Sequence, residues 1–140
     1  MPAHLCEIAG GLVAAIVCEG DVTGSDFTEA TRELLRWDDA RLRKLAAGLV
    51  DQTNAAAFNV EPARVQALVD LDIQLAQKVR RGLLVAVAAP GDLQYGMSRM
   101  WQSLADVTGF EIMVFRNHAL AMTWLRSRAS QKFGVELPSA

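Results

Sequence analysis

The sequence contains few cysteines, few histidines and no long apolar segment, and each shortage excludes a class of protein. Two cysteines cannot build the disulfide framework of a small secreted domain, and with two histidines they offer no spacing typical of a metal site. No apolar run reaches the roughly 20 residues that a membrane-spanning helix needs. The first residues lack the basic n-region of a signal peptide, so we expect a cytoplasmic location and reduced, buried thiols at Cys6 and Cys18.

An excess of positive charge is also missing. The chain has 14 Lys and Arg against 16 Asp and Glu, so neither nucleic acid nor an anionic membrane surface is an expected partner. Of its 140 residues, 51% are hydrophobic and 21% are charged, which is typical of a folded globular chain. This length supports one hydrophobic core. We therefore expect one domain over residues 1–127 and a C-terminal tail over residues 128–140.

Apolar segments alternate with helical patterns along the chain. Strands are predicted at 5–9, 12–18, 45–50, 83–89 and 110–115, and helices at 26–37, 62–81, 92–107 and 118–126. Connections are expected at 19–25, 38–44 and 51–59. Gly10-Gly11 predicts a hairpin that sets Cys6 opposite Ala15. Helical crossovers make the later strands parallel. The predicted fold is α/β, a single-layer mixed sheet of about five strands, the first antiparallel, flanked by about four helices.

The helix predicted after Asp92 has a regular apolar stripe. Its members recur at spacings of four, three, four and three and are expected to face the core: Leu93, Met97, Met100, Leu104 and Val107. Trp101 is one position off this stripe, so we expect it to be partly exposed to a ligand or a second subunit. The helix at 62–81 has a wide apolar arc. Together with Trp101, that arc favours a homodimer.

The parallel strands are expected to end at one edge of the sheet, where ligands bind in open α/β folds. This edge should gather residues 21–25, 51–54, 90–95 and 116–118. The candidate ligand- or partner-binding residues are Asp51, Thr53, Asn54, Asp92, Tyr95, Arg99, Trp101 and His118. Tyr95 and Arg99 lie four residues apart on a helix, so we expect their side chains to stack.

Two candidate chemistries are weighed against simpler interpretations. The segment 91–98 resembles a phosphate-binding loop, but Met97 stands where that chemistry needs a lysine, so no nucleotide is expected. His118 would need both a carboxylate and a hydroxyl nearby to act as a general base. Asp92 together with Ser98 or Thr53 would serve only if the fold brought them to His118. We therefore predict no catalysis, no cofactor and no metal.

Two segments resemble a STAS domain of the SpoIIAA-like branch. The first is Leu83–Ala89 followed by GDLQYGMSRM at 91–100, and the second is FRNHALAMTWL at 115–125, whose last helix carries the Ala-x-x-Trp-Leu ending of that branch. By element order the resemblance covers about residues 3–127, and its motifs cover the last third. It implies a compact αβ module with a regulatory or binding role, in a branch of mostly unassigned bacterial proteins.

Anti-sigma-factor antagonists with this fold are switched by phosphorylation of a serine in an Asp-Ser-x-Gly turn. The matching stretch here is 51–54, which keeps Asp51 but lacks the serine and the glycine, and Thr53 is the nearest hydroxyl. The resemblance implies a non-catalytic module that engages a protein partner or a small ligand through the sheet edge. The alternatives are a carrier of an apolar, lipid-like ligand, as in CRAL-TRIO-like modules, and a small hydrolase that uses the same edge.

Overall fold

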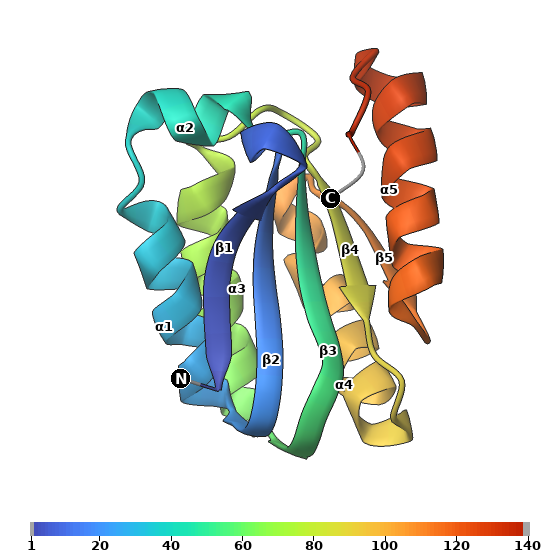
Figure 1. Cartoon of the computed structure of the whole chain (residues 1–140). Helices are drawn as coiled ribbons and strands as arrows, with labels where there is room; N and C mark the ends of the chain where they lie inside the picture. Colours follow the sequence, from blue (N-terminus) through green and yellow to red (C-terminus); the bar gives the residue numbers. More distant parts are fainter. Residues whose placement is uncertain (1, 139–140) are drawn as a thin grey trace.

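Residues 2–138, which the computed structural model describes, form one mixed sheet with helices on both faces (Figure 1). The strands, in spatial order, are β1 (Ala3–Ile8), β2 (Val13–Thr23), β3 (Ala47–Asn59), β4 (Leu84–Ala88) and β5 (Glu111–Phe115). β1 runs antiparallel to β2, and every other neighbouring pair is parallel. The predicted α/β class and strand directions are therefore confirmed.

The order of the strands decides where the helices lie. The α-helices of the described residues are α1 (Gly24–Leu35), α2 (Asp39–Lys44), α3 (Pro62–Ala76), α4 (Asp92–Leu104) and α5 (His118–Phe133), with 3-10 turns η1 (Ala9–Gly11) and η2 (Ala105–Thr108). Because each crossover joins adjacent parallel strands and is right-handed, α1, α3 and α4 cover the same face. α5 covers the other face (Figure 1). No helix within residues 2–138 combines the length and the apolar character needed to cross a bilayer.

α3 is the middle helix of the three-helix face. α1 lies on β1 and β2, and α4 lies on β5, whereas α3 packs mainly against α1, α4 and η2. The sheet below α3 carries small residues, since Ala14 and Gly48 lie next to each other in register. A helix held up by its neighbours over small side chains leaves unfilled space between helix and sheet.

β2 and β3 are longer than predicted. The segments 19–25 and 51–59, expected as connections, instead continue the strands to Thr23 and Asn59, with register shifts between Val17 and Glu19 and after Gly20. Pairing between the two strands outweighs the low strand propensity of their glycine and polar residues. Residues 51–54 therefore lie within a strand and not in a loop.

The helices also differ from prediction at their ends. Residues 38–44, expected as a connection, contain α2, and α3 ends at Ala76, before the predicted end at 81. α5 runs to Phe133 and not to 126, because Arg128 and Lys132 on its last turns both bond Glu111 of β5. The first residues of the expected tail are thus helical, and residues 139–140 lie outside the described residues.

The β1–β2 hairpin has the predicted register, with Cys6 opposite Ala15. Cys18 is fully buried and Cys6 is exposed, so the expectation of two buried thiols is wrong for Cys6. Both thiols are free. Burial, with the nearby charges of Asp51 and Asp26, raises the pKa of Cys18 to about 12, so this thiol is unreactive at neutral pH.

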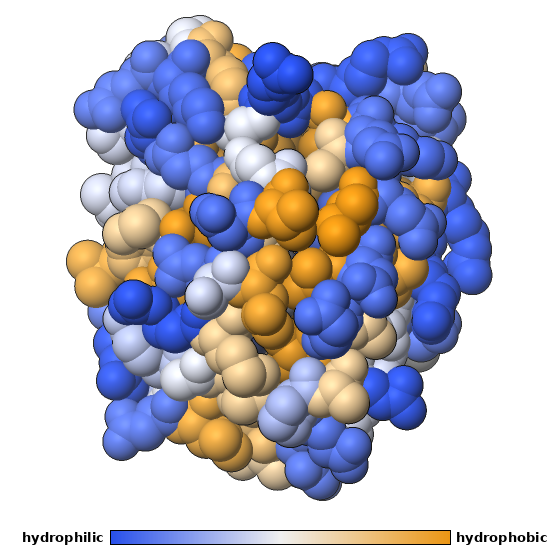
Figure 2. All heavy atoms as spheres, turned by 180° about the vertical axis from the view of Figure 1, so that it is seen from behind, coloured by the Kyte–Doolittle hydropathy of each residue, from blue (hydrophilic) through white to orange (hydrophobic). Residues whose placement is uncertain are grey.

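α4 buries a different face from the one predicted. Gln94, Ser98 and Trp101 are buried, whereas Leu93 of α4 is 62% exposed and Val107 of η2 is 70% exposed. The prediction that Trp101 is partly exposed is therefore wrong. Its large indole ring gains more from burial than the aliphatic side chains, and its N–H finds an acceptor inside. Figure 2, viewed from behind Figure 1, shows apolar side chains gathered across this face.

Two glycines test the packing of the three-helix face. A Cβ on Gly48 would meet Ala14 O at 3.8 Å and Val85 Cγ2 at 3.9 Å, which are ordinary contacts, whereas a Cβ on Gly24 would lie 2.5 Å from Arg64 Cβ of α3. We expect Gly48→Ala to raise the free energy of unfolding by about 0.5–1 kcal/mol, because alanine loses less entropy in a strand. We expect Gly24→Ala to lower it by about 1–3 kcal/mol through overpacking.

Urea denaturation followed by circular dichroism measures both changes. A loss of stability in Gly48→Ala would mean that no free space lies next to this strand.

Candidate functional site

The ends of β4 and β5 lie beside the middle of β3, and they bring together an aspartate of β3 and the first residue of α5. Asp51 pairs with Ala88, the last residue of β4, and therefore lies level with the end of that strand. His118 begins α5, three positions after the end of β5. Its Nδ1 lies 3.0 Å from Asp51 Oδ2, with the His118 side chain 50% exposed and that of Asp51 15% exposed. The predicted meeting of these two residues at the sheet edge is observed.

Thr53 joins the same carboxylate. Its backbone N–H donates to Asp51 Oδ1 at 3.0 Å, and its hydroxyl donates to the same oxygen. In a hydrolase triad the hydroxyl bonds the imidazole, and the imidazole bonds the carboxylate. Here both Thr53 and His118 bond Asp51, so the imidazole has no hydroxyl to activate in this arrangement.

A second polar cluster forms at the connections that follow β4 and β5. Arg116 Nη1 lies 2.8 Å from Asp92 Oδ1, and the guanidinium carbon lies 4.1 Å from the centre of the Tyr95 ring. The predicted stack of Arg99 on Tyr95 is therefore wrong, because Arg116 occupies the ring face. Arg99 is exposed on α4. The segment 116–118 was expected at this edge, but Arg116 was not singled out.

The two clusters together form one polar surface, which we call the rim. It consists of Asp51, Thr53, Asp92, Tyr95, Arg116 and His118. Of the other candidates, Asn54 is exposed further along β3, and Trp101 is buried on the opposite face of the sheet. Within residues 2–138 no group of His, Cys, Asp and Glu side chains is arranged to hold a metal ion.

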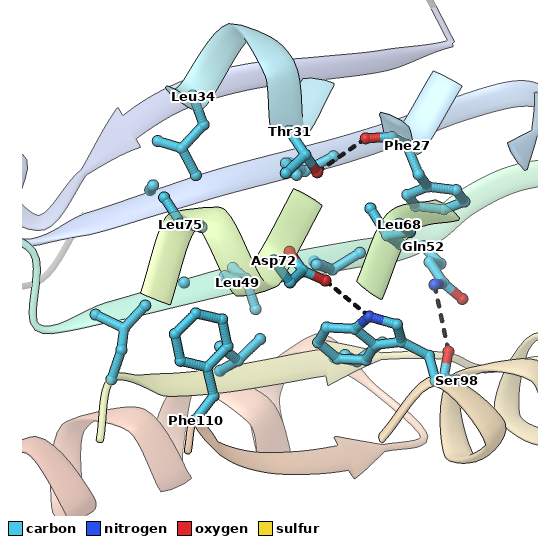
Figure 3. A pocket seen from close by; sticks show the side chains of 18 of the residues that line it. Phe27, Thr31, Leu34, Leu49, Gln52, Leu68, Asp72, Leu75, Ser98 and Phe110 are labelled. Carbon is cyan, nitrogen blue, oxygen red and sulfur yellow. Dashed lines mark hydrogen bonds between the residues drawn. The ribbon is translucent and has the colours of Figure 1, made fainter. Parts of the chain in front are cut away.

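A cavity lies on the opposite face of β3, beneath α3 (Figure 3). Its volume is about 110 Å³, and its walls are mostly apolar side chains of the sheet, α1, α3 and α4. Strand alternation explains the separation, since Asp51 and Thr53 face α5 whereas Gln52 between them faces the cavity.

Among the described residues that line the cavity, Asp72 is the one acidic or basic residue. It lies on α3 and is 6% exposed, and its Oδ2 accepts a hydrogen bond from Trp101 Nε1 of α4 at 2.9 Å. Burial raises the pKa of Asp72 to about 7, while the Trp101 hydrogen bond acts in the opposite direction. Asp70, two positions earlier, is exposed and accepts a hydrogen bond from Gln66, so the two aspartates face apart.

Gln52 is the second polar group of the cavity wall. It is 4% exposed, and its Nε2 donates to Ser98 Oγ of α4 at 3.4 Å. Its Oε1 is buried and has no hydrogen-bond partner within the described part of the chain. A buried acceptor without a donor is destabilising, and native proteins contain few of them. Figure 3 places Gln52 and Ser98 at one end of the cavity, next to Phe27.

The sequence contained a signal for Asp72 but not for Gln52. Asp72 occupies the helical spacing of Val65, Val69 and Leu75, so a carboxylate stands inside an apolar stripe. The sequence predicts a connection at 51–59, where a polar side chain such as Gln52 needs no explanation. The cavity itself had no sequence signal apart from Gly48 in an otherwise apolar strand.

Comparisons with known proteins support the fold. No protein-family model and no curated protein matches the chain. A crystal structure at 2.25 Å of an uncharacterized protein of the DUF3478 family from Shewanella loihica PV-4, which has a SpoIIAA-like fold, is similar over 88% of this chain and 91% of that one. The TM-score is 0.54 and the identity is 19%. The chain therefore has the SpoIIAA-like fold that the STAS resemblance implied.

The environment of Asp72 predicts a pH dependence of stability. Its pKa of about 7 in the folded state lies above the value of about 3.9 in the unfolded state. Between these two pH values, Asp72 is therefore protonated to a greater extent in the folded state than in the unfolded state. The contribution of Asp72 to the free energy of unfolding is therefore fully present below about pH 4 and is lost as the pH rises through about 7. Asp72→Asn stays neutral and keeps an oxygen for Trp101, so it should gain stability over the wild type as pH rises from 4 to 8.

Urea denaturation of both proteins at pH 4, 6 and 8 measures this difference, and the comparison cancels the other titrating groups. Asp70→Asn, a change at an exposed aspartate, serves as the matched control. Parallel pH profiles for the wild type and Asp72→Asn would contradict the expected shift.

Proposed function

We propose that this protein is a non-catalytic STAS-type binding module that engages a protein partner through the rim. The observation that carries the proposal is the gathering of polar side chains from three separate segments, β3 and the connections after β4 and β5, at one sheet edge. Open α/β sheets bind their ligands at this edge.

The chemistry of the rim suits recognition of a mixed-charge surface. It presents the carboxylate of Asp51 beside His118, and that of Asp92 beside the Arg116 guanidinium, which lies over the Tyr95 ring. Arginine and tyrosine are enriched among the residues that dominate binding energy at protein interfaces. Exposed ion pairs contribute little to folding, so the pairs at the rim are available for exchange with a partner's charges.

The arrangement of Thr53 supports binding over hydrolysis. Its hydroxyl is engaged by the carboxylate and not by the imidazole of His118, so the order of groups needed to activate a nucleophile is absent from these three residues. A cytoplasmic location belongs to the same proposal, supported by the two free thiols.

Removal of the Arg116 side chain tests the rim. We expect Arg116→Ala to weaken binding of a co-purified partner by about tenfold or more, since that loss corresponds to about 1.4 kcal/mol. Stability should change by less than about 1 kcal/mol, because the side chain is half exposed. Affinity is measured by calorimetry after the partner is identified by mass spectrometry.

The matched control is Arg32→Ala, which removes an equally exposed arginine paired with Glu29 on α1. It should bind like the wild type. The proposal is wrong if both variants bind equally well, or if an enzyme screen finds turnover that His118→Ala abolishes.

We also propose a homodimer. Its support is the apolar face around α4, where Leu93, Leu104 and Val107 are 62%, 41% and 70% exposed. Trp101 is buried within the protomer, so it does not contribute to a dimer surface. Exposed apolar patches of this kind are typical of interaction sites.

Analytical ultracentrifugation should give a dimer for the wild type and a monomer for the double variant Leu93→Ser and Val107→Ser. Leu120→Ser, which changes an exposed leucine on α5, should stay dimeric. A wild-type monomer at high protein concentration would reject the dimer.

A further inference from the structure

The cavity beneath α3 is large enough for a small molecule. Its volume of about 110 Å³ approaches the roughly 150 Å³ of engineered apolar cavities that stay dry and bind benzene. The space arises from the fold, because α1 and α4 hold α3 above Ala14 and Gly48 of the sheet. A well-packed interior contains few voids of this size.

The cavity walls select a neutral occupant. Among the described residues that line the cavity there is no lysine, arginine or histidine, so an anionic ligand would find no countercharge. A cation would face only Asp72, whose Oδ2 already accepts the Trp101 hydrogen bond. The end of the cavity formed by Leu34, Leu75 and Phe110 in Figure 3 offers only apolar contact.

One end of the cavity nevertheless contains a polar atom that lacks a hydrogen-bond partner among the described residues. Gln52 Oε1 is buried without a hydrogen-bond partner among residues 2–138, while the amide nitrogen donates to Ser98 Oγ. If the amide were turned over, Ser98 would bond the oxygen and the nitrogen would be left unpaired. In either orientation of the amide, one polar atom of Gln52 lacks a partner. A ligand hydroxyl group can satisfy the oxygen or the nitrogen, because a hydroxyl both donates and accepts hydrogen bonds.

The polar end is also the accessible end. Phe58, Leu68 and Met97 line the cavity and keep part of their side chains in contact with solvent. Met97 directly precedes Ser98, and Leu68 lies beside Gln52 in Figure 3. Methionine is unbranched and changes conformation easily, so a ligand can enter between α3 and α4 here.

We propose that this cavity binds a small neutral molecule, about the size of one aromatic ring, with a single hydroxyl group held against the Gln52 amide. The apolar part of the ligand lies beneath α3 towards Phe110. This site is independent of the rim, since it lies on the other face of β3.

Calorimetric titration with p-cresol and toluene tests the site, because the two probes differ by one hydroxyl. The wild type should bind p-cresol about tenfold more tightly than toluene, because toluene leaves a buried polar atom unpaired at a cost of roughly five- to a hundredfold in affinity. Gln52→Leu should keep toluene binding and lose the preference for p-cresol. Gly48→Val, whose methyl groups occupy the cavity, should weaken binding of both probes by tenfold or more.

The matched control is Gly96→Val on α4, where an added Cβ meets nothing within 4 Å, and it should bind like the wild type. Arg116→Ala should also leave binding unchanged, which separates this site from the rim. Failure of both probes to bind the folded wild type at millimolar concentration would overturn the cavity site. Equal affinity for the two probes would overturn the role of Gln52, and unchanged binding in Gly48→Val would overturn the location.

Discussion

β3 is hydrogen-bonded to β2 over most of its length and to β4 over its first residues, Ala47 to Asp51. This central parallel pairing fixes which side chains of the strand point to each face. Asp51 and Thr53 turn towards α5 and meet His118, while Gly48 and Gln52 turn towards α3. A shift of the register by one residue would exchange the two sets, so both candidate sites depend on the same ladder of backbone hydrogen bonds.

The position of α3 is the second constraint. Three consecutive right-handed crossovers place three helices on one face of the sheet, and the middle helix rests mainly on its neighbours. The buried contact between Asp72 and Trp101 joins α3 to α4 across the cavity edge. An unpaired carboxylate would be costly at this depth, so the indole N–H helps to set how α4 faces the core. Leu93 and Val107 are left on the surface as a result.

Strand directions and the hairpin register could be predicted, because both follow from local signals. Gly10-Gly11 set Cys6 opposite Ala15, and helices between strands forced parallel neighbours. The lengths of β2 and β3 could not be predicted, since residues 51–59 form a strand only because residues 19–23 lie beside them. The meeting of Asp51 with His118 followed from topology, whereas the stack of Arg116 on Tyr95 depended on side-chain geometry that no spacing reveals.

The amino-acid sequence by itself determined the alternation of elements, the α/β class and the edge of the sheet where polar residues gather. These features depend on periodicity and chain connectivity, which are local properties. Only the tertiary structure decided which face of α4 is buried, how far the long strands extend, and that a cavity with an unpaired Gln52 lies beneath α3. Such features result from competition for space between segments distant in the chain, where volume and hydrogen-bond partners are settled together.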